Sequence, residues 1–127
     1  LDTLYTKKRH TLVDPHYYDY AVAGMRRAVT NGTCHAANIP GYEVCGKTGT
    51  AQNRGHDHSA FMGFAPMNNP RIAVAVYVEN GGFGNVYGVP LGALIMEQYL
   101  NGCLSPESEK KAEAFRLRHI QYPDYAR

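Results

Sequence analysis

The chain has 127 residues and a formal net charge of +2, with 44% apolar and 19% charged residues. This size and composition suit one compact unit with a hydrophobic core, and the small charge argues against a nucleic-acid or membrane-surface role. No apolar run approaches the roughly 20 residues that cross a bilayer, and no targeting signal is present. Because the sequence begins at Leu1, without a methionine or a targeting pattern, we expect a piece of a longer protein.

The first predicted element is a helix over residues 14–32. Asp14 suits the cap, Pro15 suits the first turn, and Asn31 and Gly32 can close the far end. Apolar side chains at helical spacing form one stripe, which we expect to face the core. This stripe consists of Tyr18, Val22, Met25 and Val29.

Three strands are expected next. They read YEVCGKTGTAQ (residues 42–52), SAFMGFAP (residues 59–66) and RIAVAVYVEN (residues 71–80), with turn-forming residues between them. Both faces of the last strand are apolar, which is typical of a central strand that is covered on both sides. Short links between successive strands predict an antiparallel meander.

A second helix is expected over residues 89–102, with Pro90 near its start and Gly102 at its end. Beyond Cys103 the sequence is polar, which predicts a solvated helix or a frayed tail. The whole order corresponds to an α+β fold, a three-stranded antiparallel meander with flanking helices. We divide the chain into an N-terminal extension (residues 1–13), a structured part (14–102) and a polar tail (103–127).

The stretch GYEVCGKTGT, residues 41–50, satisfies two motifs. Read as G-x-x-x-x-G-K-T, it matches the phosphate-binding P-loop. A P-loop needs a buried strand before its first glycine and a helix from the G-K-T onward, so that the helix amino end faces the phosphates. The preceding CHAANIP is no buried strand, and the following GTAQNRGHD has no helical stripe. Nucleotide binding is therefore the weaker alternative.

Read as a strand, the same stretch forms a substrate-binding edge. Period-two alternation places Thr48 and Thr50 on one face, where two hydroxyls can bind a carboxylate. Gly49 leaves room for a substrate backbone, and Lys47 supplies a cation that can join a proton relay around a serine. The backbone N–H of Thr50 is a candidate oxyanion donor. Without further context, such a tetrapeptide is more often a plain exposed edge strand.

The wider sequence pattern favours the substrate-binding interpretation. The segments AVAGMRRAV and NGT are followed in order by GKTGTAQ, FAPMNNP, AVAV, VENGG and a helix that starts with proline. Over roughly residues 17–102, this order resembles the C-terminal part of the transpeptidase domain of class B penicillin-binding proteins, most closely the elongation-type penicillin-binding protein 2 group. Cys45 departs from the family pattern, which more often has a small residue there.

The resemblance implies a penicillin-binding/β-lactamase-like transpeptidase fold and a serine acyl transfer that cross-links peptidoglycan stem peptides, with β-lactams as mimics of the donor. It implies that Lys47 belongs to the active-site relay, that Thr48 and Thr50 recognise the carboxylate, and that Gly49 keeps the strand accessible. It implies no metal or other cofactor. It also implies a full-length protein, called the parent below, that is anchored in the bacterial inner membrane, places this domain in the periplasm and works with a glycan polymerase.

Two motifs of the family are missing. The nucleophile lies in S-x-x-K, and S-x-N lies between that motif and the K-T-G. The serines of this chain are Ser59, Ser105 and Ser108, and no S-x-N occurs. SEKK at Ser108 fits S-x-x-K by its letters, but it follows the K-T-G in a charged stretch that would not bury a nucleophile helix. We therefore expect the isolated chain to be inactive without the N-terminal half of the domain, and a non-catalytic penicillin-recognising sensor module is the alternative function.

Three smaller expectations concern the histidines, the cysteines and the last strand. HDH at residues 56–58 invites a metal site, but no third ligand is evident, so we expect a solvated turn. Cys34 and Cys45 can be bridged, although buried free thiols are the preferred interpretation. Without earlier strands of the domain, residues 71–80 would have a bare edge and an uncovered apolar face, which predicts self-association or covering of that edge by the amino-terminal segment or the tail.

Overall fold

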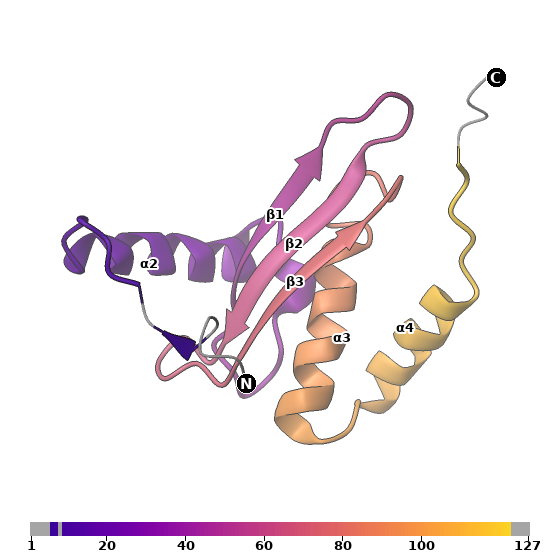
Figure 1. Cartoon of the computed structure of the whole chain (residues 1–127). Coiled ribbons are helices and arrows are strands. Elements are labelled where there is room, and N and C mark those ends of the chain that lie inside the picture. Colours follow the sequence, from indigo (N-terminus) through magenta and orange to yellow (C-terminus); the bar gives the residue numbers. More distant parts are fainter. Residues whose placement is uncertain (1–5, 8, 123–127) are drawn as a thin grey trace.

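The computed structural model describes residues 6–7 and 9–122. In chain order it contains α2 (His16–Asn31), the short 3-10 helix η1 (His35–Ala37), β1 (Cys45–Ala51), β2 (His58–Ala65), β3 (Ile72–Val78), α3 (Gly88–Asn101) and α4 (Pro106–Arg116) (Figure 1). The strands form one antiparallel sheet in the order β1-β2-β3, so the predicted α+β meander is confirmed. Parts of the predicted extension and tail lie outside the described residues. No helix in the described part of the chain is long and apolar enough to cross a membrane.

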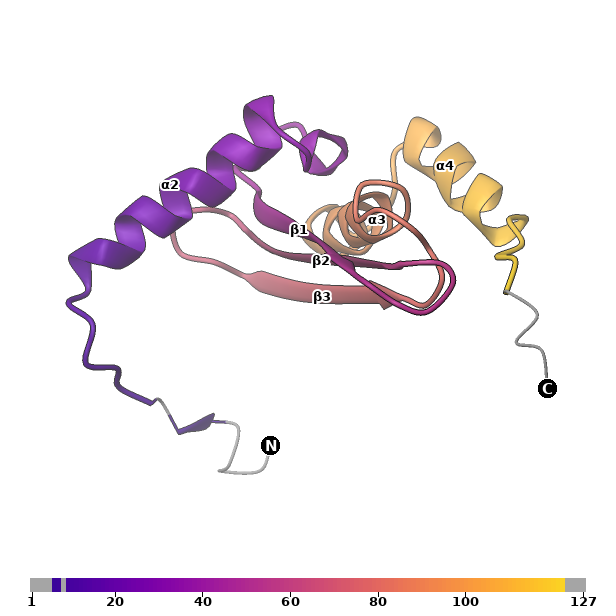
Figure 2. The same ribbon diagram turned by 90° about the horizontal axis from the view of Figure 1, so that it is seen from above.

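The helices lie over one face of the sheet (Figure 2). Helix α2 packs on β1, and α3 packs on β2 and β3. Within the described residues no helix covers the opposite face, where Ala73 and Ala75 are exposed and Tyr77 is 57% exposed. Strand β3 is therefore not covered on both faces by the described residues, although its apolar pattern suggested such covering, and it has the uncovered apolar face expected for a chain without the earlier strands of the domain. Apolar alternation shows that a face avoids water in the final assembly, but not which segment covers it.

The core lies between the sheet, α3 and the end of α2. Phe61 of β2 is 3% exposed and points toward α3. Three glycines surround the Phe61 ring. A Cβ atom added at Gly46 or at Gly63 would lie 2.6 Å from the nearest ring atom, and one added at Gly92 would lie 2.5 Å from it. The other large buried side chains include Val29, Ile39, Val44, Val89, Met96 and Leu100.

The predicted apolar stripe of helix α2 is buried only in the last turns of the helix. A carboxylate oxygen of Asp14 accepts a hydrogen bond from the backbone N–H of His16 at 3.1 Å, but Pro15 occupies the cap position, so Asp14 lies one residue before the place expected for it. Val29 is fully buried, whereas Tyr18 is 47% exposed. The first half of the helix projects beyond the sheet (Figure 1). Periodicity identifies the apolar face of a helix, but not how far along it a partner surface extends.

The polar tail forms helix α4, which returns along α3 (Figure 1). Gly102, with a φ of 77°, ends α3 in the left-handed conformation that glycine adopts without strain. The Ser105 hydroxyl caps α4 by accepting a hydrogen bond from the backbone N–H of Ser108 at 3.3 Å. Helix α4 is solvated on most of its surface, as predicted, but it is also attached to α3 through Glu97.

Candidate functional site

The four predicted site residues lie in the middle of β1, which is an edge strand of the sheet. The register pairs Thr48 with the core residue Phe61, so Thr48 and Thr50 lie on the helix-covered face. Lys47 and Gly49 lie on the opposite face. The prediction that both threonines share one face is confirmed, and the lysine faces the other way.

The extended conformation of β1 decides between the two motifs. A P-loop would need a helix that begins near Gly46, but residues Cys45–Ala51 are a strand that pairs along its length with β2. The nucleotide-binding alternative is therefore wrong.

A pocket of about 240 Å³ lies beside the two threonines. Its lining residues are Thr33, Thr48, Thr50, Phe83, Gly84 and Asn85. Thr33, which follows α2, places its hydroxyl oxygen 2.9 Å from the hydroxyl oxygen of Thr48. Three hydroxyl groups around one pocket are a donor set that suits a carboxylate.

The loop between β3 and α3, residues 81–87, forms the other wall of this pocket, and Ser59 holds it in place. The Ser59 side chain is fully buried in β2. Its hydroxyl donates to the carbonyl oxygen of Phe83 at 2.9 Å and accepts a hydrogen bond from the backbone N–H of Gly88 at 3.0 Å. One side chain therefore fixes both sides of the loop segment that lines the pocket.

Gly84 brings the backbone of this loop into close contact with the sheet. An added Cβ at Gly84 would lie 2.5 Å from the carbonyl oxygen of Ala60 and 2.6 Å from that of Gly49. Both obstacles are backbone atoms, so a larger residue would displace the loop. The GGFGN segment therefore has a packing role at the edge of the candidate site.

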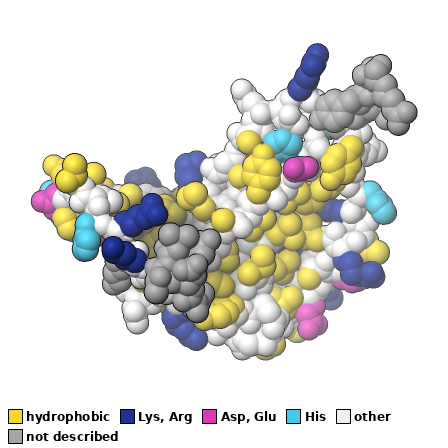
Figure 3. Space-filling model, viewed as in Figure 1, with side chains coloured by type: hydrophobic (Ala, Val, Ile, Leu, Met, Phe, Trp, Pro, Cys, Tyr) yellow, Lys and Arg dark blue, Asp and Glu magenta, His cyan; other side chains and the backbone are white. Residues whose placement is uncertain are grey.

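Lys47 borders an exposed apolar surface, the bare sheet face, which we define as Ala60, Met62, Ala73, Ala75 and Tyr77 (Figure 3). The Lys47 ammonium group donates to the carbonyl oxygen of Thr48 at 2.7 Å, and its side chain is exposed. A hollow of about 290 Å³, lined by Lys47 and most of this face, is open to solvent. The candidate site thus has two halves, one on each side of the β1 edge.

The S-x-x-K match at residues 108–111 does not bring its serine and its lysine together. The Ser108 hydroxyl donates to a carboxylate oxygen of Glu97, and Lys111 pairs with Glu107 at 2.7 Å. Ser105 caps α4, and Ser59 holds the loop. All three serine hydroxyls therefore make structural hydrogen bonds.

Two cysteines beside β1 are buried and free, which confirms the preferred interpretation for Cys34 and Cys45. Burial raises the pKa of the Cys34 thiol, although hydrogen bonds with Thr33 and Thr48 and the charge of Lys47 act in the opposite direction. Burial also raises the pKa of Cys45. Because the thiolate is the nucleophilic form, neither thiol is suited to replace a serine.

The HDH turn is held by hydrogen bonds. His58 Nδ1 accepts from the backbone N–H of Asn80 at 2.9 Å, and Asp57 Oδ1 accepts from the backbone N–H of Asn53 at 3.4 Å. The described residues contain no group of three or more His, Cys, Asp or Glu that could hold a metal ion.

Sequence reasoning missed Thr33, Ser59 and Gly84 as parts of the site. Thr33 belongs to NGT and Gly84 to GGFGN, which were visible as segments, but nothing in their spacing indicates contact with β1. Ser59 gave no signal, because a lone serine in a strand is usually a surface residue.

A meander with a Lys-Thr-Gly-Thr edge strand beside a hydroxyl-lined pocket defines a protein of the penicillin-recognising transpeptidase class. The family model of the penicillin binding protein transpeptidase domain matches residues 4–100. The chain belongs to this family.

Three relatives show how much of the family architecture the chain contains. Peptidoglycan D,D-transpeptidase MrdA of Haemophilus influenzae is 36% identical, over 73% of this chain and 17% of that protein. Penicillin-binding protein A of Mycobacterium tuberculosis, solved as an imipenem acyl-enzyme complex, has a TM-score of 0.64 and 32% identity over 74% of this chain and 21% of that one. PBP2 of Helicobacter pylori, solved with MreC, has a TM-score of 0.59 and 25% identity, over 72% of this chain and 19% of that one. The chain therefore spans only part of the proteins that it matches.

Proposed function

We propose that this chain supplies the K-T-G side of the active site of a peptidoglycan D,D-transpeptidase, and that the acylated serine lies in a part of the parent outside these 127 residues. The observation that carries the proposal is the gathering of the Thr33, Thr48 and Thr50 hydroxyls in one pocket at the open edge of β1. Membership of the transpeptidase family and the peptidoglycan activity in the name of the H. influenzae relative support it.

In this proposal the terminal carboxylate of a D-Ala-D-Ala stem peptide binds the hydroxyls of Thr48 and Thr50. The peptide lies along the β1 edge as an added strand, which Gly49 permits because it has no side chain. The serine oxygen of the parent forms a bond to the penultimate carbonyl carbon, the bond to the last D-alanine breaks, and the serine proton leaves with that amine. The backbone N–H of Thr50 stabilises the oxyanion. The amine of a second stem peptide then forms a bond to the acyl carbon, the bond to the serine oxygen breaks, and the proton of the amine returns to that oxygen.

Lys47 connects the two halves of the site. Its side chain lies at the border of the bare sheet face, on the side of β1 away from the threonines. We place the serine-bearing part of the domain on this face, because an apolar surface of this kind needs a covering partner. The Lys47 cation then lies beside the serine and its base, where it joins the proton relay.

Labelling with a fluorescent penicillin tests this proposal. The 127-residue chain is expected to stay unlabelled, whereas the parent chain extended upstream to include its serine motif is expected to be labelled covalently. Labelling of the short chain would place the nucleophile among its own residues and contradict the assignment. An unlabelled extended chain would contradict the transpeptidase function, and labelling without cross-linking of stem peptides would indicate the sensor alternative.

By itself, the chain is expected to self-associate through the bare sheet face and the free edge of β3, which pairs only with β2 among the described strands. Helix α4 packs on α3 and leaves this edge free. Ala75→Lys should shift the sedimentation profile toward monomer, because it places a charge on the bare sheet face. Ala114→Lys, on the exposed side of α4, is the matched control. A wild-type monomer with freely exchanging β3 amides would contradict this prediction.

We propose a setting for the parent from its resemblance to the family. We place it in the inner membrane, with this domain in the periplasm and a glycan polymerase as its partner. The H. pylori relative was solved with MreC, which supports assembly of the parent with other proteins. In this arrangement residues 14–102 form the part of the domain that carries β1, residues 1–13 are an extension and residues 103–127 are a tail.

A further inference from the structure

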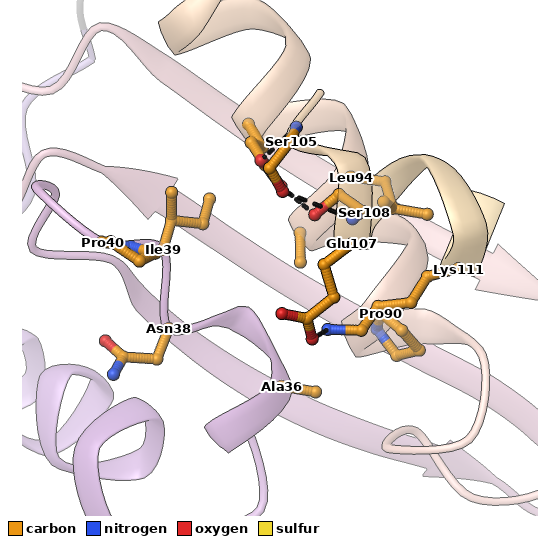
Figure 4. Close-up of a pocket in the computed structure, with 12 residues that line it drawn as sticks. Ala36, Asn38, Ile39, Pro40, Pro90, Leu94, Ser105, Glu107, Ser108 and Lys111 are labelled. Atoms are coloured by element: carbon orange, nitrogen blue, oxygen red, sulfur yellow. Dashed lines mark hydrogen bonds and ion pairs between the residues drawn. The ribbon is translucent and has the colours of Figure 1, made fainter. Parts of the chain in front are cut away.

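Helix α4 lies beyond residues 4–100, which match the family model, yet it contacts Glu97 of α3 and also Tyr87, the residue that directly precedes α3. The turn at Gly102 reverses the chain, so the start of α4 lies beside the end of α3 and its own end lies beside the start of α3. Between these two contacts, α4 borders a pocket of about 340 Å³ whose other walls are α3 and residues 36–40 (Figure 4). The helix is therefore attached mainly at its two ends.

The first attachment consists of two hydrogen bonds to the carboxylate of Glu97. Glu97 of α3 accepts a hydrogen bond from the backbone N–H of Ser105 at 2.9 Å and another from the Ser108 hydroxyl. Burial acts to raise the pKa of Glu97, but these hydrogen bonds and the charge of Lys111 outweigh burial and hold that pKa below its ordinary value. The Glu97 carboxylate is therefore ionised at neutral pH, where it can accept both hydrogen bonds.

The second attachment is an aromatic contact near the candidate site. The Phe115 ring of α4 lies 5.8 Å from the ring of Tyr87, between centroids. The Arg118 guanidinium carbon lies 4.6 Å from the centroid of Phe115 and 5.5 Å from that of Tyr87. Tyr87 is the last residue of loop 81–87 and directly precedes α3.

Several contacts hold loop 81–87, among them a hydrogen bond from the Val89 N–H to the carbonyl oxygen of Gly84 at 2.9 Å, and α4 provides a further contact. The first part of the loop is fixed to the HDH turn by a hydrogen bond from the Gly82 N–H to the carbonyl oxygen of Asp57 at 2.8 Å. Its middle is fixed by Ser59. Its last residue, Tyr87, has its ring packed against α4 rather than buried in the core.

We propose that α4 is an accessory clamp that holds loop 81–87 against the threonine pocket, with Phe115 and Tyr87 as positioning residues for carboxylate binding. The loop contributes Phe83, Gly84 and Asn85 to the pocket, so a shift of its last residues changes the wall that faces Thr48. The identity of the ligand rests on the proposed function, but the holding of the loop does not.

Hydrogen exchange of the 127-residue chain tests the clamp directly. Phe115→Ala should speed exchange of the Val86 amide in the loop, and of the Val89 amide that donates to the loop carbonyl oxygen of Gly84, about two- to tenfold, because it removes one aromatic pair. The amides of β2 should keep their rates. Phe115→Tyr should restore slow exchange because it retains the ring, and Lys110→Ala, an exposed change on the same helix, is the control. Unchanged loop rates in Phe115→Ala, or an equal acceleration in β2, would overturn the proposal.

A kinetic measurement on the extended, penicillin-labelled parent separates the clamp from the proposed function. Phe115→Ala should weaken non-covalent penicillin binding about two- to tenfold and leave the acylation rate at saturation unchanged, because the serine and Lys47 are untouched. Phe115→Tyr should bind as the wild type does. Faster loop exchange with wild-type binding would overturn the positioning role. If the wild-type parent is not acylated, the proposed function fails, and the exchange result still decides the clamp.

Discussion

Replacing Lys47 with alanine in the parent transpeptidase is expected to slow acylation by penicillin about 10²- to 10⁴-fold, the range typical of a group that assists proton transfer. The folding cost should be small, because the side chain is exposed and makes one hydrogen bond, to the neighbouring carbonyl oxygen of Thr48. The two effects are measured separately, by the rate of covalent labelling and by thermal unfolding of the same preparation.

Two further variants give this prediction its controls. Lys47→Arg keeps the positive charge but holds its proton too tightly for a relay, so it should recover binding and little of the acylation rate. Lys111→Ala removes an exposed lysine that pairs with Glu107 on α4, and it should acylate at the wild-type rate. An unimpaired Lys47→Ala protein would show that β1 contributes only binding surface.

Replacing Phe61 with alanine is expected to lower the free energy of unfolding by about 3–5 kcal/mol, the range measured for buried aromatic residues. The ring is 3% exposed and fills a space bounded by Gly46, Gly63 and Gly92, none of which has a side chain that could move into the vacated volume. Because single domains are stable by only about 5–15 kcal/mol, this loss is a large fraction of the total and should lower the urea midpoint markedly. Urea denaturation followed by circular dichroism measures this change.

The adjacent residue supplies the matched control. Met62 points to the bare sheet face and is 58% exposed, so Met62→Ala should change the free energy of unfolding by less than about 1 kcal/mol in the monomer. Similar destabilisation by both variants would mean that the two faces of β2 are equally buried in solution. That result would support covering of the bare sheet face by a second copy of the chain.

The two halves of the site suggest why the K-T-G strand lies at a sheet edge. Thr48 faces the pocket on the helix-covered side, and Lys47 faces the bare sheet face, so only an edge strand lets one ligand reach both. A central strand would have neighbours on both sides and no free backbone groups for a substrate peptide. The binding geometry therefore depends on which strand is left unpaired.

Much of the local structure was predictable from the residues. Alternation around Gly49 predicted an extended strand with both threonines on one face, and the structure confirms this. The ends of α3 followed from Pro90 and Gly102, because proline suits a first turn and glycine a left-handed end. The periodicity did not show that the first half of α2 is exposed, nor which surface would cover the apolar face of β3. Both depend on partner surfaces that a one-dimensional pattern does not contain.

The sequence by itself determined the element types, the edge motif and the family, because local backbone preferences and motif spacing are properties of consecutive residues. Only the tertiary structure decided that Thr33 and loop 81–87 join β1 in one pocket, that Ser59 supports this loop, and that α4 packs at its end. These contacts join residues that lie far apart along the chain. They arise from packing and from the hydrogen bonds that buried polar groups require, neither of which spacing in the sequence encodes.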